Sequence, residues 1–163
     1  MNLPVFWMEP TGETVERSGV TSGGAHYTTE VPVYRRADTG ETMLLRDAPV
    51  GAMWDADWMP DVFKGPDGIC LVVRTPGGEW MVDNEASNCT MPQRVPSGEG
   101  ATRFERTHYC WVRHGDPRDP QGITSGQPLH VDKNGNTCAA GAGSIACGSY
   151  HGFLHHGHLT DCP

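Results

Sequence analysis

The sequence predicts a mainly β fold, an antiparallel sandwich or irregular barrel with long Pro/Gly-rich loops and little helix. Gly 21 and Pro 13 make turn-forming residues about a fifth of the 163 residues. Short runs of β-branched and aromatic residues alternate with these turns, as they do in all-β domains. No window shows the sustained spacing of three and four that an amphipathic helix needs. A chain of this length fits one domain with a real core.

Residues 1–30 are predicted to form an extended arm in front of a single β-rich domain, residues 31–163. In LPVFWMEP, the apolar run Val5 to Met8 stands beside prolines, which favour extended backbone and prevent a helix. The stretch SGVTSGGAHYTTE that follows is flexible and has little to bury. Ordering such an arm costs about 1 kcal/mol per residue. We therefore expect contacts with another chain to fix it.

The next elements are hairpins. VPVYRRA and TMLLRDAPV flank DTGE, which places a bend at Thr39-Gly40. The clearest hairpin runs from Ile69 to Asn84 with Pro76-Gly77-Gly78 in its loop, and it should bury Val72 and Trp80.

Two further turn signals and two long loops follow. Asn134-Gly135 in PLHVDKNGNTC suits a type I′ turn, and a final hairpin is expected to turn near His156-Gly157. Residues 91–105 and 114–128 are rich in proline, glycine and charge and are predicted to be long loops. Loops of that length in a compact domain are usually functional, involved in binding or disordered.

Aromatic residues give the candidate partner contacts. In GAMWDADWMPDVF, tryptophans and a phenylalanine alternate with aspartates. This stretch either plugs one end of a sheet or offers an aromatic surface to a partner protein. The residues predicted to bind a partner are Phe6, Trp7, Trp54 and Trp58.

Charge and hydropathy exclude two classes of partner. Lys+Arg 12 against Asp+Glu 20 gives a net charge of -8, without the basic stripe that nucleic-acid binding needs. No apolar run approaches the roughly 20 residues of a membrane helix. The start lacks the basic region of a signal peptide, so synthesis in a cytoplasm with reduced cysteines is expected.

The cysteines suggest either one structural zinc ion or no cofactor. Six cysteines are present without a C-x-x-C motif. Well-spaced thiols in a loop-rich fold can converge in space, although free cysteines are also common as buried apolar residues. The candidate ligands are Cys89, His108, Cys110, Cys138 and Cys147.

The stretch YHGFLHHGHLTDC holds four histidines near the end of the chain. On a strand, His156 and His158 would share one face and could bind a metal ion. A hydrolase needs a third ligand and a carboxylate base as well, and Asp161 is the only carboxylate nearby. A hairpin with exposed histidines is the simpler interpretation. If zinc is bound, we expect the thiolates, rather than this tail, to hold it.

The second half of the chain resembles small uncharacterised proteins encoded by bacteria and their phages. The similarity lies in Ser144-Ile145 followed by Tyr150 to Leu159, and in GGEW, SN and HYCWVRHG. The resemblance implies a phage or prophage setting and zinc binding.

These observations lead to two hypotheses about function. The first is a non-enzymatic structural protein, most concretely a bacteriophage virion accessory that decorates or bridges capsid subunits. Its partners would be other subunits of the assembly, and it would be made in the host cytoplasm and located in the virion. The alternative is a small metal-dependent hydrolase that uses the C-terminal histidines.

Overall fold

The computed structural model describes residues 1–101, 103–135, 138 and 143–162. Its strands are β1 (Asn2–Pro4), β2 (Phe6–Val20), β3 (His26–Arg36), β4 (Thr42–Met43), β5 (Ala52–Asp55), β6 (Leu71–Thr75), β7 (Gly78–Met81), β8 (Arg94–Ser97), β9 (Arg103–Arg106), β10 (Trp111–His114), β11 (His130–Lys133), β12 (Ile145–Cys147), β13 (Tyr150–His155) and β14 (His158–Asp161). Three single turns of 3₁₀ helix, η1 (Leu45–Asp47), η2 (Asp61–Phe63) and η3 (Glu99–Ala101), are the helical structure of these residues. The predicted mainly β fold with little helix is confirmed.

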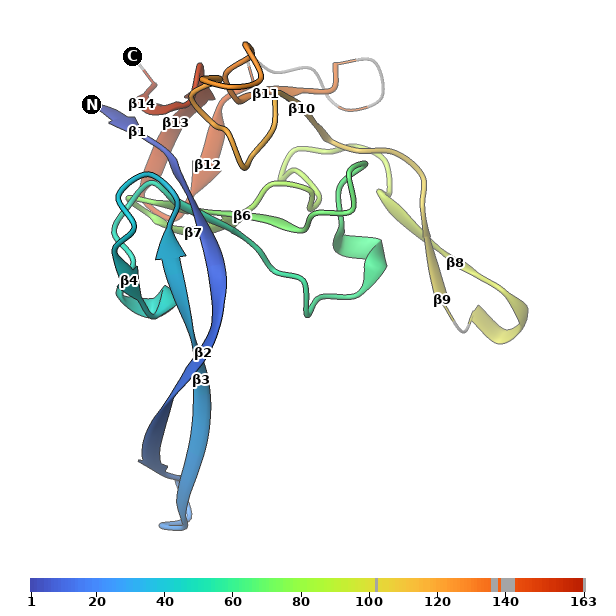
Figure 1. The fold of residues 1–163 in the computed structure, drawn as a ribbon. Coiled ribbons are helices and arrows are strands. Elements are labelled where there is room, and N and C mark those ends of the chain that lie inside the picture. Colours follow the sequence, from blue (N-terminus) through green and yellow to red (C-terminus); the bar gives the residue numbers. More distant parts are fainter. Residues whose placement is uncertain (102, 136–137, 139–142, 163) are drawn as a thin grey trace.

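The strands form two main sheets and two ribbons (Figure 1). One sheet has the order β4-β3-β2-β5-β6-β7, and the other has the order β1-β14-β13-β12. The ribbons are β10-β11 and β8-β9. Neighbouring strands are antiparallel except for β2 and β5, which pair in parallel. Within the described residues, the sheets do not close into a barrel.

The core lies on both faces of strands β5 and β6. Met53 and Val73 pack on one face with Leu154 and Leu159 of the second sheet. Alternate residues of the same strands pack on the other face, because side chains of a strand point to opposite sides in turn. Those residues belong to a second cluster that contains Phe6, Met8, Ala52, Trp54 and Val72. The uninterrupted apolar run of β6 therefore reflects burial on both faces.

The hairpin predicted from Ile69 to Asn84 is confirmed as β6 and β7. Val73 lies opposite Trp80, and the turn occupies residues 76–77. Val72 is buried as predicted, whereas Trp80 is half-buried and packs against the core. The expected bend at Thr39-Gly40 and the final hairpin turning at His156-Gly157 are also present.

The prediction that residues 1–30 form an arm fixed by another chain is corrected. The first residues of this segment belong to the domain's own sheets. β1 pairs with β14, and the start of β2 pairs with β5. Four consecutive residues, Val5 to Met8, are buried. Such a run suits a strand with core on both faces, so this stretch needs no second chain to cover it.

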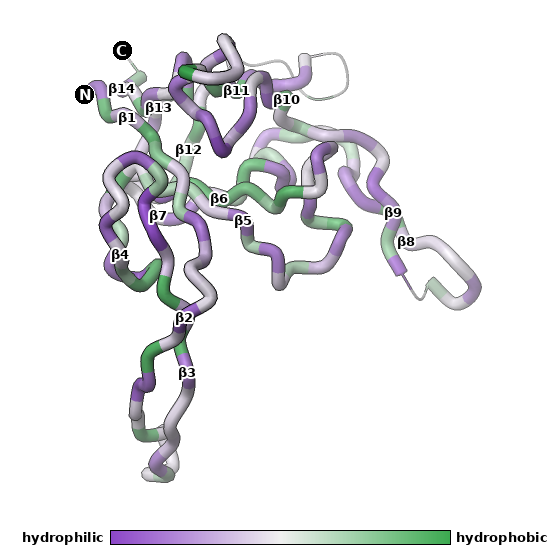
Figure 2. Tube along the Cα trace, in the orientation of Figure 1, coloured by the Kyte–Doolittle hydropathy of each residue, from purple (hydrophilic) through white to green (hydrophobic). Residues whose placement is uncertain are grey.

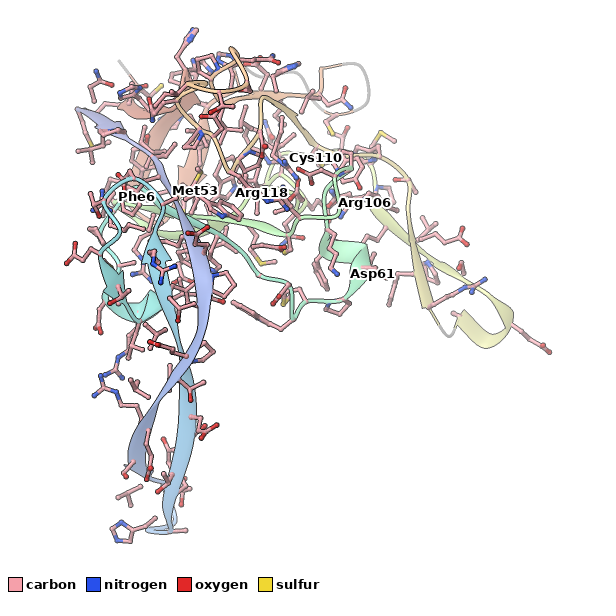
Figure 3. All side chains as sticks on the ribbon, in the orientation of Figure 1. Phe6, Met53, Asp61, Arg106, Cys110 and Arg118 are labelled. Atoms are coloured by element: carbon pink, nitrogen blue, oxygen red, sulfur yellow. The ribbon has the colours of Figure 1, made fainter. Side chains whose placement is uncertain are left out.

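Three of the four residues predicted to bind a partner are also corrected, because they are buried in the domain's own core. Phe6, Trp7 and Trp54 are buried in the domain, so they cannot also form a surface for a partner. Figure 3 shows Phe6 and Met53 within the body of the molecule. Trp58 alone of the four is exposed, at 61%.

The rest of β2 pairs with β3 in a long ribbon that projects away from the body (Figure 1). Polar and apolar residues are mixed along it (Figure 2). Residues 12–30 are exposed apart from the half-buried Gly19. Gly19 lies opposite Tyr27, whose ring occupies the space that a Cβ at position 19 would need. The predicted boundary at residue 30 therefore falls inside a hairpin rather than between an arm and a domain.

Removing the outer part of this ribbon should leave the domain folded. Replacing residues 16–30 with a two-residue Asn-Gly turn would join Val15 to Val31, which are register partners. Because the deleted side chains are exposed, we expect the melting temperature to change by less than about 3 °C. Circular dichroism melts of the two proteins test this. A fall of about 10 °C or more would show that the ribbon supports the core.

Two predicted loops have different outcomes. The loop predicted at residues 91–105 contains the ribbon β8-β9, so that expectation is wrong. Residues 115–129 lack strands, and Asp119 organises them by accepting backbone hydrogen bonds from Ile123, Thr124 and Ser125 at 3.0, 2.9 and 2.7 Å. These bonds hold the pKa of Asp119 below its usual value.

The turn at Asn134-Gly135 does not close the expected hairpin. Its strand β11 pairs with the earlier strand β10, with Trp111 opposite Lys133. Asn134 caps this ribbon instead, because its backbone N–H donates to the Cys110 carbonyl at 2.8 Å. The turn sends the chain back towards Cys138, whose N–H donates to the Asn134 carbonyl at 3.0 Å.

Candidate metal centre

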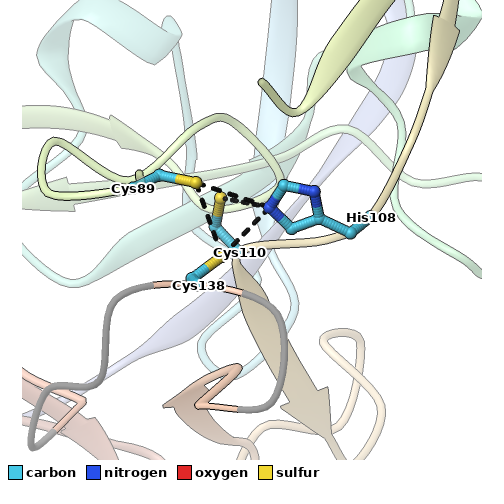
Figure 4. A group of neighbouring side chains, drawn as sticks. All are labelled: Cys89, His108, Cys110 and Cys138. Atoms are coloured by element: carbon cyan, nitrogen blue, oxygen red, sulfur yellow. Dashed lines mark hydrogen bonds between the residues drawn. The ribbon is translucent and has the colours of Figure 1, made fainter. Parts of the chain in front are cut away.

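Four side chains from three separate segments converge beside the ribbon β10-β11 (Figure 4). Cys89 lies after β7, His108 and Cys110 lie between β9 and β10, and Cys138 lies after β11. His108 and Cys110 are two residues apart, a spacing that places both side chains on one side of extended backbone. The Asn134 turn then brings Cys138 to them.

The ligand atoms of this cluster lie as close to one another as the ligands of one metal ion do. The Nε2 atom of His108 is 3.0 Å from Cys138 Sγ, 3.4 Å from Cys110 Sγ and 3.5 Å from Cys89 Sγ. The Sγ atoms of Cys89 and Cys138 are 3.6 Å apart. All four atoms lie within 4.8 Å of one another, so the cluster could hold a metal ion.

Thr107 orients the imidazole of His108 towards the three sulfurs. The Thr107 hydroxyl has one hydrogen, and it donates this to the Pro92 carbonyl at 2.6 Å. The hydroxyl oxygen, 2.9 Å from His108 Nδ1, therefore accepts the Nδ1–H of the ring. This leaves the Nε2 lone pair free to face the cluster, and such a partner is what fixes the tautomer of a metal-binding histidine.

The surroundings oppose negative charge on the thiols. Cys110 is fully buried, and Cys138 is nearly so. Burial, together with the neighbouring thiols of Cys138 and Cys89, raises the pKa of Cys110 to about 12. Three thiolates this close need a cation to compensate their charge, and metal binding to such a site releases protons.

The structure brings together four of the five predicted ligands. The fifth, Cys147, lies on β12, where its Sγ contacts the Glu79 carbonyl at 3.6 Å. It is not part of the cluster, so that prediction is corrected. Cys70 lies in the second core cluster, and burial raises the pKa of its thiol to about 11.

The histidines of the tail do not form the predicted pair. His156 lies in the turn between β13 and β14 with a φ of 52°, so it does not share a strand face with His158. His155 instead meets His130 and Asp132 of β11, and the ligand atoms of these three residues lie within 4.8 Å of one another. Burial, followed by the neighbouring His130, lowers the pKa of His155. The sequence signal for this group is H-x-D in β11, which places both side chains on one face.

The fold and the first cluster define a β-rich protein with a cysteine and histidine cluster that could hold a metal ion. Among the residues that the structure describes, no helix has the length and apolar character needed to cross a bilayer. No protein-family model, curated protein or solved structure matches this chain.

Proposed function

We propose that the chain is a non-enzymatic structural protein whose fold is stabilised by one zinc ion at Cys89, His108, Cys110 and Cys138. The observation that carries the proposal is the spacing of the four ligand atoms. A tetrahedral zinc ion with Zn–S of about 2.3 Å and Zn–N of about 2.0 Å separates two sulfurs by about 3.8 Å and a sulfur from a nitrogen by about 3.5 Å. The cluster has 3.6 Å for one sulfur pair and 3.0 to 3.5 Å for the sulfur–nitrogen pairs.

The composition of the site favours a structural rather than a catalytic ion. Three thiolates and one imidazole fill all four tetrahedral positions, so no position remains for water or substrate. The ligands come from segments far apart in the sequence, and an ion would cross-link them. It would join the loop after β7 to the base of β10-β11 and to the loop before β12.

We further propose that the protein acts in an assembly with other protein subunits. The ribbon β2-β3 extends well beyond the core, and an isolated two-stranded ribbon is marginally stable in water. Its exposed strand edges are suited to pairing with a strand of another subunit. The resemblance of the second half of the chain to phage and bacterial proteins favours a virion accessory as the setting. The alternative, a hydrolase using the C-terminal histidines, could not use His156 and His158 as a pair of ligands, because His156 lies in the turn between β13 and β14.

Metal analysis of the full-length protein tests the zinc site. We expect one zinc ion per chain that survives dialysis, and a cobalt-substituted form with intense thiolate-to-metal charge-transfer absorption. Cys138→Ser should remove most of that absorption, whereas Cys147→Ser should keep it. A protein that retains no metal, or equal absorption in both variants, would overturn the site.

Sedimentation tests the assembly. The full chain and the variant lacking residues 16–30 would each be centrifuged alone and with purified virions or an infected-cell lysate. We expect the full chain to sediment with the particles and the shortened variant to remain in the supernatant. If neither protein sediments with particles, the virion setting is wrong.

A further inference from the structure

A second group of metal-ligating side chains lies on the ribbon β10-β11, apart from the thiol cluster. His130 and Asp132 alternate with the buried Val131 on β11, so both point away from the core. His155 reaches them from the end of β13. All three side chains are half-buried rather than free on the surface.

The polar atoms of the group face one another. His130 Nε2 lies 3.1 Å from Asp132 Oδ2, and His155 Nε2 lies 3.5 Å from Asp132 Oδ1. The rings of His130 and His155 stack with centroids 4.0 Å apart. The two nitrogens therefore reach the same carboxylate from neighbouring positions.

A second observation points to a missing partner. His155 Nε2 is shielded from solvent, and its 3.5 Å contact with Asp132 Oδ1 does not have the geometry of a hydrogen bond, so within the described part of the chain the atom makes none. Shielded polar atoms in folded proteins nearly always have a partner, so such an atom calls for an explanation. An ion placed between the two imidazoles and the carboxylate would supply one.

We propose that His130, Asp132 and His155 form a second metal site, specific for a borderline divalent transition-metal ion such as Zn²⁺. Two imidazole nitrogens and one carboxylate oxygen suit that class of ion, whereas Mg²⁺ and Ca²⁺ prefer oxygen ligands. Three protein ligands leave at least one coordination position for water. The site is therefore open and exchangeable, unlike a closed site of three thiolates and one imidazole. It holds whether or not the thiol cluster binds zinc.

Equilibrium dialysis against Zn²⁺ compares the full-length protein with His155→Ala. We expect the unchanged protein to bind one ion more than the variant, because removing a ligand from a three-ligand site should weaken binding by about 100-fold or more. Asp132→Asn keeps the shape of the side chain but removes its charge, and it should lose the same ion. His151→Ala is the matched control, since His151 lies on the same strand but bonds to Ser144 Oγ at 3.1 Å.

The difference in the number of bound ions between the unchanged protein and His155→Ala tests the histidine site. The total number bound by the unchanged protein tests the thiol site separately. Two ions in the unchanged protein and one in His155→Ala support both sites. One bound ion in the unchanged protein and none in His155→Ala support the histidine site alone. Equal numbers in the two proteins would overturn the histidine site, and the imidazoles would then serve only to contact Asp132. Mg²⁺ at the same concentration should not compete for the ion that His155→Ala loses.

Discussion

Replacing Cys110 with serine should abolish binding of the zinc ion that we propose at the cysteine and histidine cluster, and it should lower the melting temperature by about 10 °C. Binding of a structural zinc ion is coupled to folding, because the unfolded chain has no preformed site. Losing one of three thiolates should remove at least about 4 kcal/mol of the free energy of unfolding, and each kcal/mol corresponds to about 2–4 °C in a domain of this size. Thermal melts with and without a strong chelator measure the effect.

The control is Cys147→Ser, which changes a half-buried thiol outside the cluster. It should melt close to the unchanged protein and respond to chelator in the same way. Serine in the buried position of Cys110 costs some stability by itself, so the chelator comparison is decisive. Chelator should lower the melting temperature of the unchanged protein much more than that of Cys110→Ser, which keeps only the proposed histidine site. Equal melts with and without chelator in the unchanged protein would refute a structural ion.

Most of the cluster could be predicted from residue type, but its exact membership could not. Thiols and an imidazole in loop-rich segments indicated a site, and the pair His108 and Cys110 has a spacing that suits one side of extended backbone. Cys138 and Cys147 looked equivalent in sequence, because they flank the same glycine- and alanine-rich stretch. The pairing of β11 with β10 separates them, since it carries Cys138 to the cluster while β12 carries Cys147 to β7.

The fold was predictable where the pattern was local. Alternating apolar residues and a Pro-Gly-Gly loop marked the hairpin β6-β7, which needs only neighbouring residues to form. The N-terminal run Val5 to Met8 was misassigned because β5, which pairs with it, and β14, which pairs with the preceding strand β1, are distant in sequence. Proline beside an apolar run favours extended backbone, but that preference does not say which chain the strand joins.

The buried ion pair between Arg113 and Asp83 could not be predicted from the sequence. Arg113 of β10 donates from Nε to Asp83 Oδ1 at 2.9 Å and from Nη1 to Asp67 Oδ2 at 2.9 Å. The side chains of Arg113 and Asp83 are only 5% and 1% exposed. Asp83 also accepts the Leu71 N–H at 3.1 Å, so it connects β6 to β10. A Cβ on Gly65 would collide with Arg113 Nη2 and Asp83 Oδ1, so a larger residue there would displace the ion pair.

Replacing Arg113 with methionine should lower the free energy of unfolding by about 3–5 kcal/mol, because it leaves the Asp83 carboxylate buried and unpaired. The matched control is Arg46→Met, since Arg46 and Asp47 form an ion pair of 3.7 Å with both side chains more than half exposed. That pair should contribute at most about 1 kcal/mol. Urea unfolding at pH 7 compares the two variants. Similar small losses in both would show that the Arg113 contacts contribute no more than a surface pair.

The cost of Arg113→Met should depend on pH in a defined direction. Burial acts to raise the pKa of Asp67, but the hydrogen bonds and charge of Arg113 outweigh it and lower that pKa. A carboxyl whose pKa is lowered by folding stabilises the protein above its unfolded pKa of about 3.9 and loses that contribution as the pH falls through the folded value. Burial raises the pKa of Asp83 even beside Arg113, and Arg113→Met removes the hydrogen bonds and charge that oppose this rise. The difference in the free energy of unfolding between the unchanged protein and Arg113→Met should therefore be larger at pH 7 than at pH 3, and it should begin to shrink above pH 4 as Asp83 takes up a proton. It should shrink further as the pH falls through the lowered pKa of Asp67. A difference that stays constant down to pH 3 would mean that packing of the Arg113 side chain, rather than its charge, holds β10 against Asp67 and Asp83.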